Sequence, residues 1–308
     1  MPLDGYRWYD WFPSISYSSS NTALPGTNPP APPSRIMVDT GNSTVFAKDG
    51  LGNGGWTQET DPSTATRIAA GGATQLLTNS CNQIYAKDTV GVGGWIQETD
   101  CGASQAIDVS ATGVQVLLNA CNAVYAKTGI SYGGWTQETA CNTATAIAVG
   151  GNTQMLINSC NAVYAKNTIG VEGWIQETPC GTAKAIATSS TGTQMLINAC
   201  DAVYAKTGIG TDGWTQETDC NTARSIAVGD DTQAVITFCN AVYVKNTIGV
   251  GGWTQEADCG TANLVAVGTG GRQVIRTGDN SVYAKDTIGV GGWGLQAAAG
   301  TAIAIDVG

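Results

Sequence analysis

Short runs of alternating apolar and polar residues follow one another along most of the chain, separated by turns rich in glycine or asparagine. Residues 144–179 show the pattern: ATAIAVG, TQMLINS, AVYAK and WIQET are divided by the turns GGN, SCN and NTIGVEG. Alternation with period two, and the abundance of Val, Ile, Thr, Tyr and Trp, predict β-strands. The segment therefore predicts four short strands joined by tight turns.

This four-strand pattern occurs seven times, and each copy contains one tryptophan. Successive tryptophans lie alternately 39 and 40 residues apart, at Trp56, Trp95, Trp135, Trp174, Trp214, Trp253 and Trp293. An aromatic residue precedes each by ten positions, at Phe46, Tyr85, Tyr125, Tyr164, Tyr204, Tyr243 and Tyr283, and a lysine follows that aromatic by two. Four strands in a repeat of this length are typical of one propeller blade. A solenoid coil would be shorter, and a trefoil would have three repeats. The sequence predicts an all-β, seven-bladed propeller of four-stranded blades.

The two ends of the repeat region are complementary. The first repeat begins at RIMVDTGN, which aligns with the second strand of the other repeats, so its own first strand is missing. The chain ends in TAIAIDVG, residues 301–308, an unused copy of that first strand. We therefore expect the C-terminal strand to complete the first blade and close a ring over residues 35–308, which removes open sheet edges.

Residues 1–34 have a different composition. They hold seven of the nine prolines and a dense aromatic cluster: Tyr6, Trp8, Tyr9, Trp11 and Phe12. Proline and serine at this density argue against a packed domain. Five aromatic residues between positions 6 and 12 are unusual for a flexible leader. We interpret the segment as an extended anchoring arm that docks on another protein or on the chain's own ring.

The ten cysteines obey the repeat. Repeats two to six each have one cysteine four residues before the tyrosine and another six residues after the tryptophan, whereas repeats one and seven lack both. Pairing within repeats leaves none over, and both partners lie at the same end of a blade. The hypothesis is five disulfides: Cys81–Cys101, Cys121–Cys141, Cys160–Cys180, Cys200–Cys220 and Cys239–Cys259. The alternative is ten reduced thiols. Metal binding is disfavoured, because there is no CxxC motif and no histidine.

Disulfides imply an oxidising destination, yet the first residues do not resemble a secretory signal. Unconventional export, release by lysis as for viral particle proteins, or a missing leader would each reconcile these observations, and we favour the second. The expected location is extracellular or on a virion surface. A net charge of -10 disfavours nucleic acid and anionic membranes as partners. No apolar run is long enough for a transmembrane helix, so membrane insertion is not expected.

The repeated polar residues predict scaffold roles. Three residues after each tryptophan stands a glutamate, except for Gln296 in the last repeat. Six equivalent carboxylates do not provide the two unlike environments of an acid–base pair, so a structural hydrogen bond or salt bridge is expected. Each repeated lysine should lay its stem along the blade with its head in solvent. Each tryptophan should pack between blades; the alternative is that its edge lines a sugar-binding pocket between them.

No recognised catalytic or cofactor motif is present. The chain has no histidine, which removes the commonest general base. It has no calcium loop, Walker loop, GxSxG elbow or zinc spacing, so we expect no cofactor, no metal and no enzymatic activity. Departures from the repeat include Asn53, Tyr132, Glu172 and Asp212, before the Gly-Trp element. Arg272, Arg276 and Phe238 are also unusual for their positions, and drift is the simplest explanation of all seven.

The motifs IGVGGWTQE, AIAVG and NAVYAK resemble the repeats of the tachylectin-2 and tectonin type of β-propeller lectins. In those families a Gly-Trp element ends one blade and a short apolar strand begins the next. The resemblance covers about residues 35–308 and implies sugar sites near the seven repeat tryptophans. This chain departs from those families in its seven repeats, its paired cysteines and its lack of longer sugar-binding loops. The N-terminal arm matches no family.

Together these features predict a non-enzymatic recognition or adhesion protein. Its lectin-like propeller would be anchored by the arm to a larger extracellular assembly, with a virus or phage particle (tail or capsid surface) as the favoured one. The ligand would be a host glycan or a host surface protein. Alternatives are a free secreted multivalent lectin, a purely structural virion decoration protein, and a hydrolase using the central channel. The last requires unlike carboxylates that the repeats do not supply.

Overall fold

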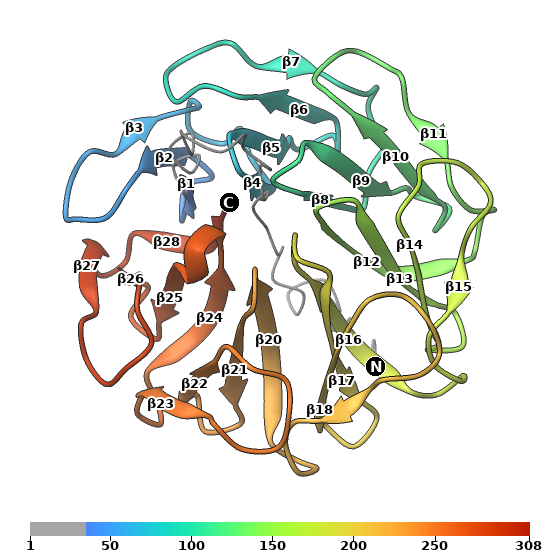
Figure 1. Ribbon diagram of the computed structural model, residues 1–308. Helices are drawn as coiled ribbons and strands as arrows, with labels where there is room; N and C mark the ends of the chain where they lie inside the picture. The colour runs from blue at the N-terminus through green and yellow to red at the C-terminus, as the bar shows by residue number, and fades with distance from the viewer. Residues whose placement is uncertain (1–34) are drawn as a thin grey trace, which may run out of the picture.

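A computed structural model describes residues 35–308, which form seven antiparallel four-stranded sheets arranged around a central axis (Figure 1). The predicted all-β, seven-bladed propeller is confirmed. The anchoring arm proposed for residues 1–34, with its aromatic cluster, lies outside the described residues. Within residues 35–308 no helix is long and apolar enough to cross a membrane.

The strands occupy four positions in each blade, counted outward from the axis. Innermost are β28 (Ala302–Val307), β4 (Arg67–Gly71), β8 (Ala106–Val109), β12 (Ala144–Gly150), β16 (Ala183–Thr188), β20 (Ala223–Gly229) and β24 (Ala262–Val267). Second are β1 (Arg35–Thr40), β5 (Thr74–Thr78), β9 (Val114–Leu118), β13 (Thr153–Asn158), β17 (Thr193–Asn198), β21 (Thr232–Thr237) and β25 (Gln273–Thr277). Third are β2 (Val45–Asp49), β6 (Ile84–Lys87), β10 (Val124–Thr128), β14 (Val163–Lys166), β18 (Val203–Thr207), β22 (Val242–Lys245) and β26 (Val282–Lys285). Outermost are β3 (Thr57–Gln58), β7 (Ile96–Gln97), β11 (Thr136–Gln137), β15 (Ile175–Gln176), β19 (Thr215–Gln216), β23 (Thr254–Ala257) and β27 (Gly294–Ala297). A 3-10 turn, η2 (Thr269–Gly271), follows β24.

The C-terminal strand closes the ring as predicted. β28 pairs with β1 in antiparallel register, with Val307 opposite Ile36 and Ile305 opposite Val38. The first blade is therefore built from one strand at the end of the chain and three at the beginning. Because β28 occupies the inner edge of β1, that edge offers no free backbone groups to another strand.

In five blades the outermost strand has only two residues, because a threonine side chain replaces the next backbone hydrogen bond to the third strand. In the first blade, Thr60 Oγ1 accepts a hydrogen bond from Val45 N at 3.0 Å, in place of a backbone carbonyl. The same threonine recurs in blades two to five, where it caps the third strand in the same way. In blades six and seven Ala257 and Ala297 stand at this position, and β23 and β27 continue to four residues.

The five predicted disulfides are confirmed. They are Cys81–Cys101, Cys121–Cys141, Cys160–Cys180, Cys200–Cys220 and Cys239–Cys259. Each joins the turn between the second and third strands to the connection that leads into the next blade. The turn is shaped locally: Asn158 Oδ1 accepts hydrogen bonds from Cys160 N and Ala162 N, and Asn161 adopts a positive φ of 63°. We call this end of the ring the disulfide face.

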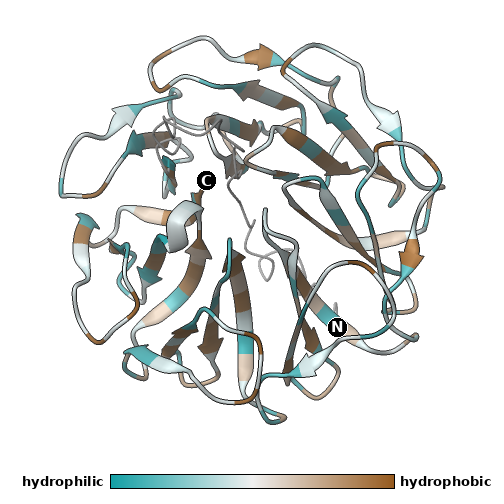
Figure 2. Ribbon diagram, in the orientation of Figure 1, coloured by the Kyte–Doolittle hydropathy of each residue, from teal (hydrophilic) through white to brown (hydrophobic). Residues whose placement is uncertain are grey.

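Apolar side chains of neighbouring blades pack together to form the core. A representative cluster joins Met155 and Ile157 of the fourth blade to Ile186 and Leu196 of the fifth. Figure 2 shows that apolar residues concentrate in the inner strands, whereas the outer loops are mixed. Near the axis space is tight: a Cβ added to Gly150 would lie 2.5 Å from Thr188 O of the next blade. This crowding accounts for the small residues of the inner strands.

Candidate functional site: two faces of a stapled ring

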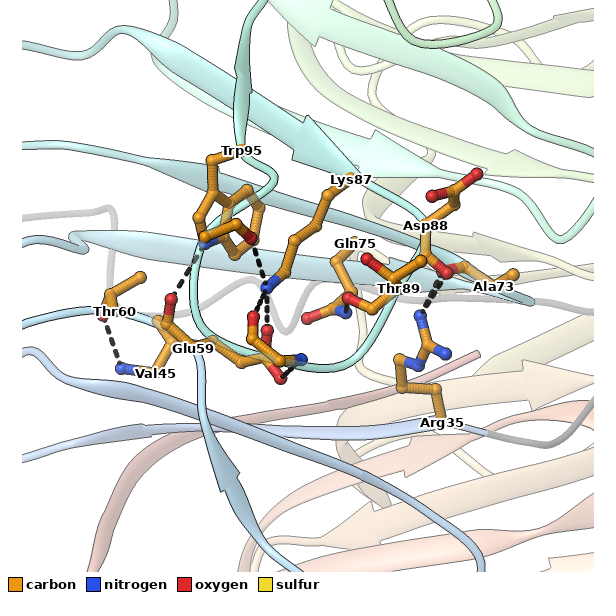
Figure 3. A network of polar contacts seen from close by, with 12 residues as sticks. Arg35, Val45, Glu59, Thr60, Ala73, Gln75, Lys87, Asp88, Thr89 and Trp95 are labelled. Atoms are coloured by element: carbon orange, nitrogen blue, oxygen red, sulfur yellow. Dashed lines mark hydrogen bonds and ion pairs between the residues drawn. The ribbon is translucent and has the colours of Figure 1, made fainter.

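A cluster of three repeated side chains joins each blade to the next (Figure 3). Between the first two blades, the Glu59 carboxylate forms a buried ion pair with Lys87 Nζ and accepts a hydrogen bond from Gly91 N at 3.0 Å. The backbone carbonyl of Glu59 accepts a hydrogen bond from Trp95 Nε1, also at 3.0 Å. Lys87 Nζ lies 4.7 Å from the centroid of the Trp95 ring. The loop after the third strand is therefore fastened to the preceding blade.

Five further junctions repeat this arrangement. The ion pairs are Lys127–Glu98, Lys166–Glu138, Lys206–Glu177, Lys245–Glu217 and Lys285–Glu256. The structural role expected for the glutamates is confirmed. The prediction that the lysine heads lie in solvent is wrong: Lys166 is only 2% exposed, and its Nζ also donates to Gly170 O. Burial lowers the pKa of Lys166 to about 8.

The seventh junction, between the last blade and the first, has no carboxylate. Lys48 Nζ donates to Gln296 Oε1 at 2.5 Å, and Gly52 N donates to the same oxygen at 2.9 Å. Trp56 Nε1 donates to Gln296 O at 2.8 Å. Burial lowers the pKa of Lys48 to about 8, and the charge of Arg272 lowers it further. The hydrogen bonds of this junction match those of the other six, but no carboxylate balances the charge of the lysine.

All seven repeat tryptophans lie between blades, as predicted from the sequence. They are half-buried, and each indole N–H donates to a carbonyl of the preceding blade. A lysine ammonium lies over each ring, 4.6 to 5.4 Å from its centroid. The indole donor and part of the ring face are therefore engaged in the scaffold. Sugar binding at Trp56, Trp95, Trp135, Trp174, Trp214, Trp253 and Trp293 stays a prediction.

The loops between the third and outermost strands form the other end of the ring, which we call the loop face. Three residues before the tryptophan, five of these loops expose an apolar side chain: Val92 (84%), Tyr132 (62%), Val171 (68%), Val250 (87%) and Val290 (88%). Asn53 and Thr211 occupy this position in the first and fifth blades. Five of the seven blades therefore carry an exposed apolar residue at the same loop position.

The described chain begins at the loop face. Arg35 is the first residue of β1, and its guanidinium forms an ion pair with Asp49 at 2.9 Å, where the first of these loops starts. The same guanidinium donates to Ala73 O and to Asp88 O in the second blade. The first described residue therefore lies at the loop face.

Two hollows open on the disulfide face, in the two blades that lack a disulfide. The larger, about 420 Å³, lies in the first blade and is lined by Thr40, Gly41, Asn42, Thr44, Phe46, Gln58, Pro62, Gly300 and Thr301. The smaller, about 260 Å³, lies in the seventh and is lined by Gly260, Thr261, Thr277, Gly278, Asp279 and Tyr283. The two hollows occupy equivalent places in their blades. Their positions were not foreseen from the sequence, although the loss of both cysteines marks these blades.

Three buried aspartates stand among the apolar residues of the second and inner strands. Asp108 and Asp306 replace an alanine of the inner strand, and each accepts backbone hydrogen bonds, Asp108 from Val149 N at 2.7 Å and Asp306 from Ala70 N at 2.8 Å. Burial raises the pKa of Asp108 well above its usual range, and the charge of Asp306 adds to the effect. Both carboxylates are closed to solvent and hold the next blade. The alanine-to-aspartate change was the signal missed in the sequence.

Asp39, on β1, is the third. Burial raises its pKa to about 7, and its Oδ1 has no hydrogen-bond partner among residues 35–308.

No group of three or more Cys, Asp or Glu side chains in the described ring is arranged to hold a metal ion.

Comparisons with known proteins agree on the fold. The sequence matches no protein-family model and no curated protein. Among solved structures, apo AztD from Citrobacter koseri is similar with a TM-score of 0.62 at 9% identity, covering 90% of this chain and 98% of that one. Prp20p from Saccharomyces cerevisiae gives 0.56 at 12%, covering 82% and 80%. YCF48 bound to D1 peptide gives 0.56 at 11%, covering 88% and 98%. At these identities the likeness extends to the propeller fold.

Proposed function

We propose that this protein is a non-enzymatic recognition protein that works outside the cell, anchored by one face and binding its ligand with the other. The observation that carries the proposal is the circle of exposed apolar tips on the loop face. The repeated charged and aromatic side chains are already engaged between blades. Four of the exposed tips are valines, and the fifth, Tyr132, donates to Asp100 Oδ1 of the preceding blade at 2.9 Å. Exposed apolar side chains of this kind are stabilised when a partner covers them.

The loop face is the anchoring side. Arg35, the residue to which the proposed arm is joined, lies there, beside the first loop. The aromatic cluster of the arm can add buried apolar area to the same interface, since aromatic residues contribute strongly to protein contacts. Two similar propellers are described as bound to proteins: YCF48 to D1 peptide, and Prp20p to Gsp1p and histones. The assembly is a virus or phage particle, and the five disulfides suit its exposure to an oxidising environment.

The disulfide face points outward and recognises a host glycan, as in the lectin-like families that the repeats resemble. Five disulfides make this face covalently rigid and suit an oxidising environment. Two hollows with aromatic and polar linings open there. Rigid, preformed polar sites lose little conformational entropy on binding, which favours a small ligand such as a sugar.

A glycan array with the full-length protein tests the recognition half of the proposal. Binding to a defined set of host glycans is expected. Absence of binding to every glycan would leave a structural decoration protein as the better account. If the protein binds glycans but never associates with a particle, it is a free secreted lectin.

Anchoring is tested separately, by deleting residues 1–34. The shortened protein should lose association with its particle while keeping glycan binding and thermal stability. A matched variant that keeps the arm but carries Val250→Ser and Val290→Ser, at the two most exposed tips, should weaken association without unfolding the ring. Undiminished association of both variants would contradict the proposed orientation.

A further inference from the structure

We propose that the hollow of the first blade, between Phe46, Gln58 and Asn42, binds one neutral pyranose sugar. The inference rests on the proposed function and deepens it, because it assigns the glycan to one site and one sugar class. The site lies on the disulfide face and is separate from the seven tryptophans.

The first blade departs from the repeat at three positions that meet in this hollow. In blades two to six a cysteine bridge joins the two turns here, whereas the first blade has Asn42 and Pro62. The third strand has phenylalanine at position 46, where the other six blades have tyrosine. The loss of the disulfide removes the bridge between the two turns, and the phenylalanine removes a tyrosine hydroxyl. Both changes therefore act on the same part of the blade.

Asn42 lines the hollow, and the oxygen of its amide is already engaged. Its Oδ1 accepts hydrogen bonds from Thr40 Oγ1 at 2.5 Å and from Thr44 Oγ1 at 2.9 Å. With both hydroxyls directed at the oxygen, the NH₂ group is the donor left for a ligand. A fixed amide donor of this kind matches a sugar hydroxyl or ring oxygen.

Gln58 presents the complementary acceptor. Its Nε2 donates to Thr60 O at 2.8 Å, which fixes the amide and leaves Oε1 as the acceptor for a ligand. In blade four the equivalent oxygen, on Gln176, is engaged by the hydroxyl of Tyr164 at 3.3 Å, and blades five and six repeat that bond. Phe46 has no hydroxyl, and no hydrogen bond within residues 35–308 reaches Gln58 Oε1.

The lining selects a neutral ligand with an apolar face. None of the nine lining residues carries a charge, so an acidic sugar would lose hydration without gaining a cationic partner. The half-buried Phe46 ring offers an apolar wall for the C–H face of a pyranose. The volume, about 420 Å³ in an open hollow, admits one ring with its substituents projecting to solvent.

The seventh blade serves as an internal comparison. Its hollow has Tyr283, and Leu295 replaces the glutamine. Asp279 replaces the asparagine, and it accepts hydrogen bonds from Thr277 Oγ1 and Ser281 N. This hollow is smaller and lacks the amide pair. We therefore assign a single site per chain.

The test uses two variants whose residues the repeat itself tolerates. Gln58→Leu places the leucine of the seventh blade in the first, and Phe46→Tyr restores the tyrosine of the other six. Saturation-transfer NMR with methyl glycosides of galactose, glucose, mannose and N-acetylglucosamine measures binding to the full-length proteins. We expect the wild type to bind at least one glycoside and each variant to bind it at least 10-fold more weakly. The control, Gln176→Leu in the fourth blade, should match the wild type.

The outcomes separate this inference from the proposed function. If the wild type binds glycans on the array and both first-blade variants bind as well as it does, the site assignment is overturned and glycan recognition stands. If the wild type binds no glycan in either assay, both are overturned. Circular dichroism of each variant verifies that the ring is folded, so a loss of binding is read as a loss of the site.

Discussion

Lys48 and Gln296 form the one junction of the ring in which a buried lysine meets an amide instead of a carboxylate. The two residues lie 248 positions apart and join the last blade to the first, with Nζ 2.5 Å from Oε1. At the other six junctions the lysine is paired with glutamate. The closing junction therefore holds a buried cation with no compensating charge, and it should be the weakest of the seven.

The first prediction is that Gln296→Glu stabilises the ring. A carboxylate there completes the ion pair with Lys48 and should raise the free energy of unfolding by about 1–3 kcal/mol. The reverse change at a charged junction, Glu138→Gln, should lower it by about 3 kcal/mol, since it leaves Lys166 unpaired. Guanidinium unfolding measures both. Equal or lower stability of Gln296→Glu would show that charge balance does not limit the closing junction.

The second prediction concerns pH and Asp39. Its pKa is raised from 3.8 to about 7 in the folded protein by burial. Between these values the folded chain holds a proton that the unfolded chain has released, so this residue makes the free energy of unfolding fall as pH rises. The penalty is complete above pH about 7 and absent below pH about 4.

The variant Asp39→Asn isolates that effect. It should be more stable than the wild type at pH 7.5, and the difference should shrink toward pH 4. Other buried carboxyls, such as Asp108, contribute equally to both proteins and cancel in the comparison. A stability difference that is constant from pH 4 to 8 would contradict the assignment.

The third prediction tests the disulfides. Replacing Cys160 and Cys180 together with alanine opens a loop whose ends are 20 residues apart. In the chain-entropy account this should lower the free energy of unfolding by about 3 kcal/mol. The repeat shows that a blade can fold without the bridge, because blades one and seven lack it. Thermal unfolding with and without reductant checks the result; an unchanged midpoint under full reduction would be incompatible with it.

The fourth prediction tests ring closure. Removing residues 301–308 deletes β28 and exposes the inner edge of β1. The shortened chain should unfold at lower temperature and associate into oligomers, because an unpaired edge can recruit another strand. Analytical ultracentrifugation and thermal unfolding measure both effects. A stable monomer with the wild-type midpoint would mean that the other blades hold the ring without β28.

The fold and the cysteine pairs could be predicted because their signals are periodic. The tryptophan spacing, the aromatic residue ten positions earlier and the unused strand at 301–308 are all visible along one chain direction. Cys160 and Cys180 belong to one blade, so their pairing follows from the repeat. Each of these signals involves residues of a single repeat, or the two ends of the repeat region. It can therefore be recognised without knowing which side chains meet between blades.

The side-chain partners were harder to predict, because they lie in different blades. The ion-pair partner of Lys166, Glu138, lies 28 residues earlier, on the preceding blade. Solvation of the lysine head was therefore the natural expectation, and it was wrong. The hollow of the first blade likewise depends on Asn42 and Gln58, which come together only when the turn and the outer strand are folded.

The most direct test of the account is the stoichiometry of glycan binding. Isothermal titration of the full-length protein with its best array glycan should give saturable heat with about one site per chain, and Gln58→Leu should abolish it. A stoichiometry near seven would place the sugar at the repeated tryptophans instead. Absence of any saturable heat, with a folded ring, would contradict glycan recognition itself.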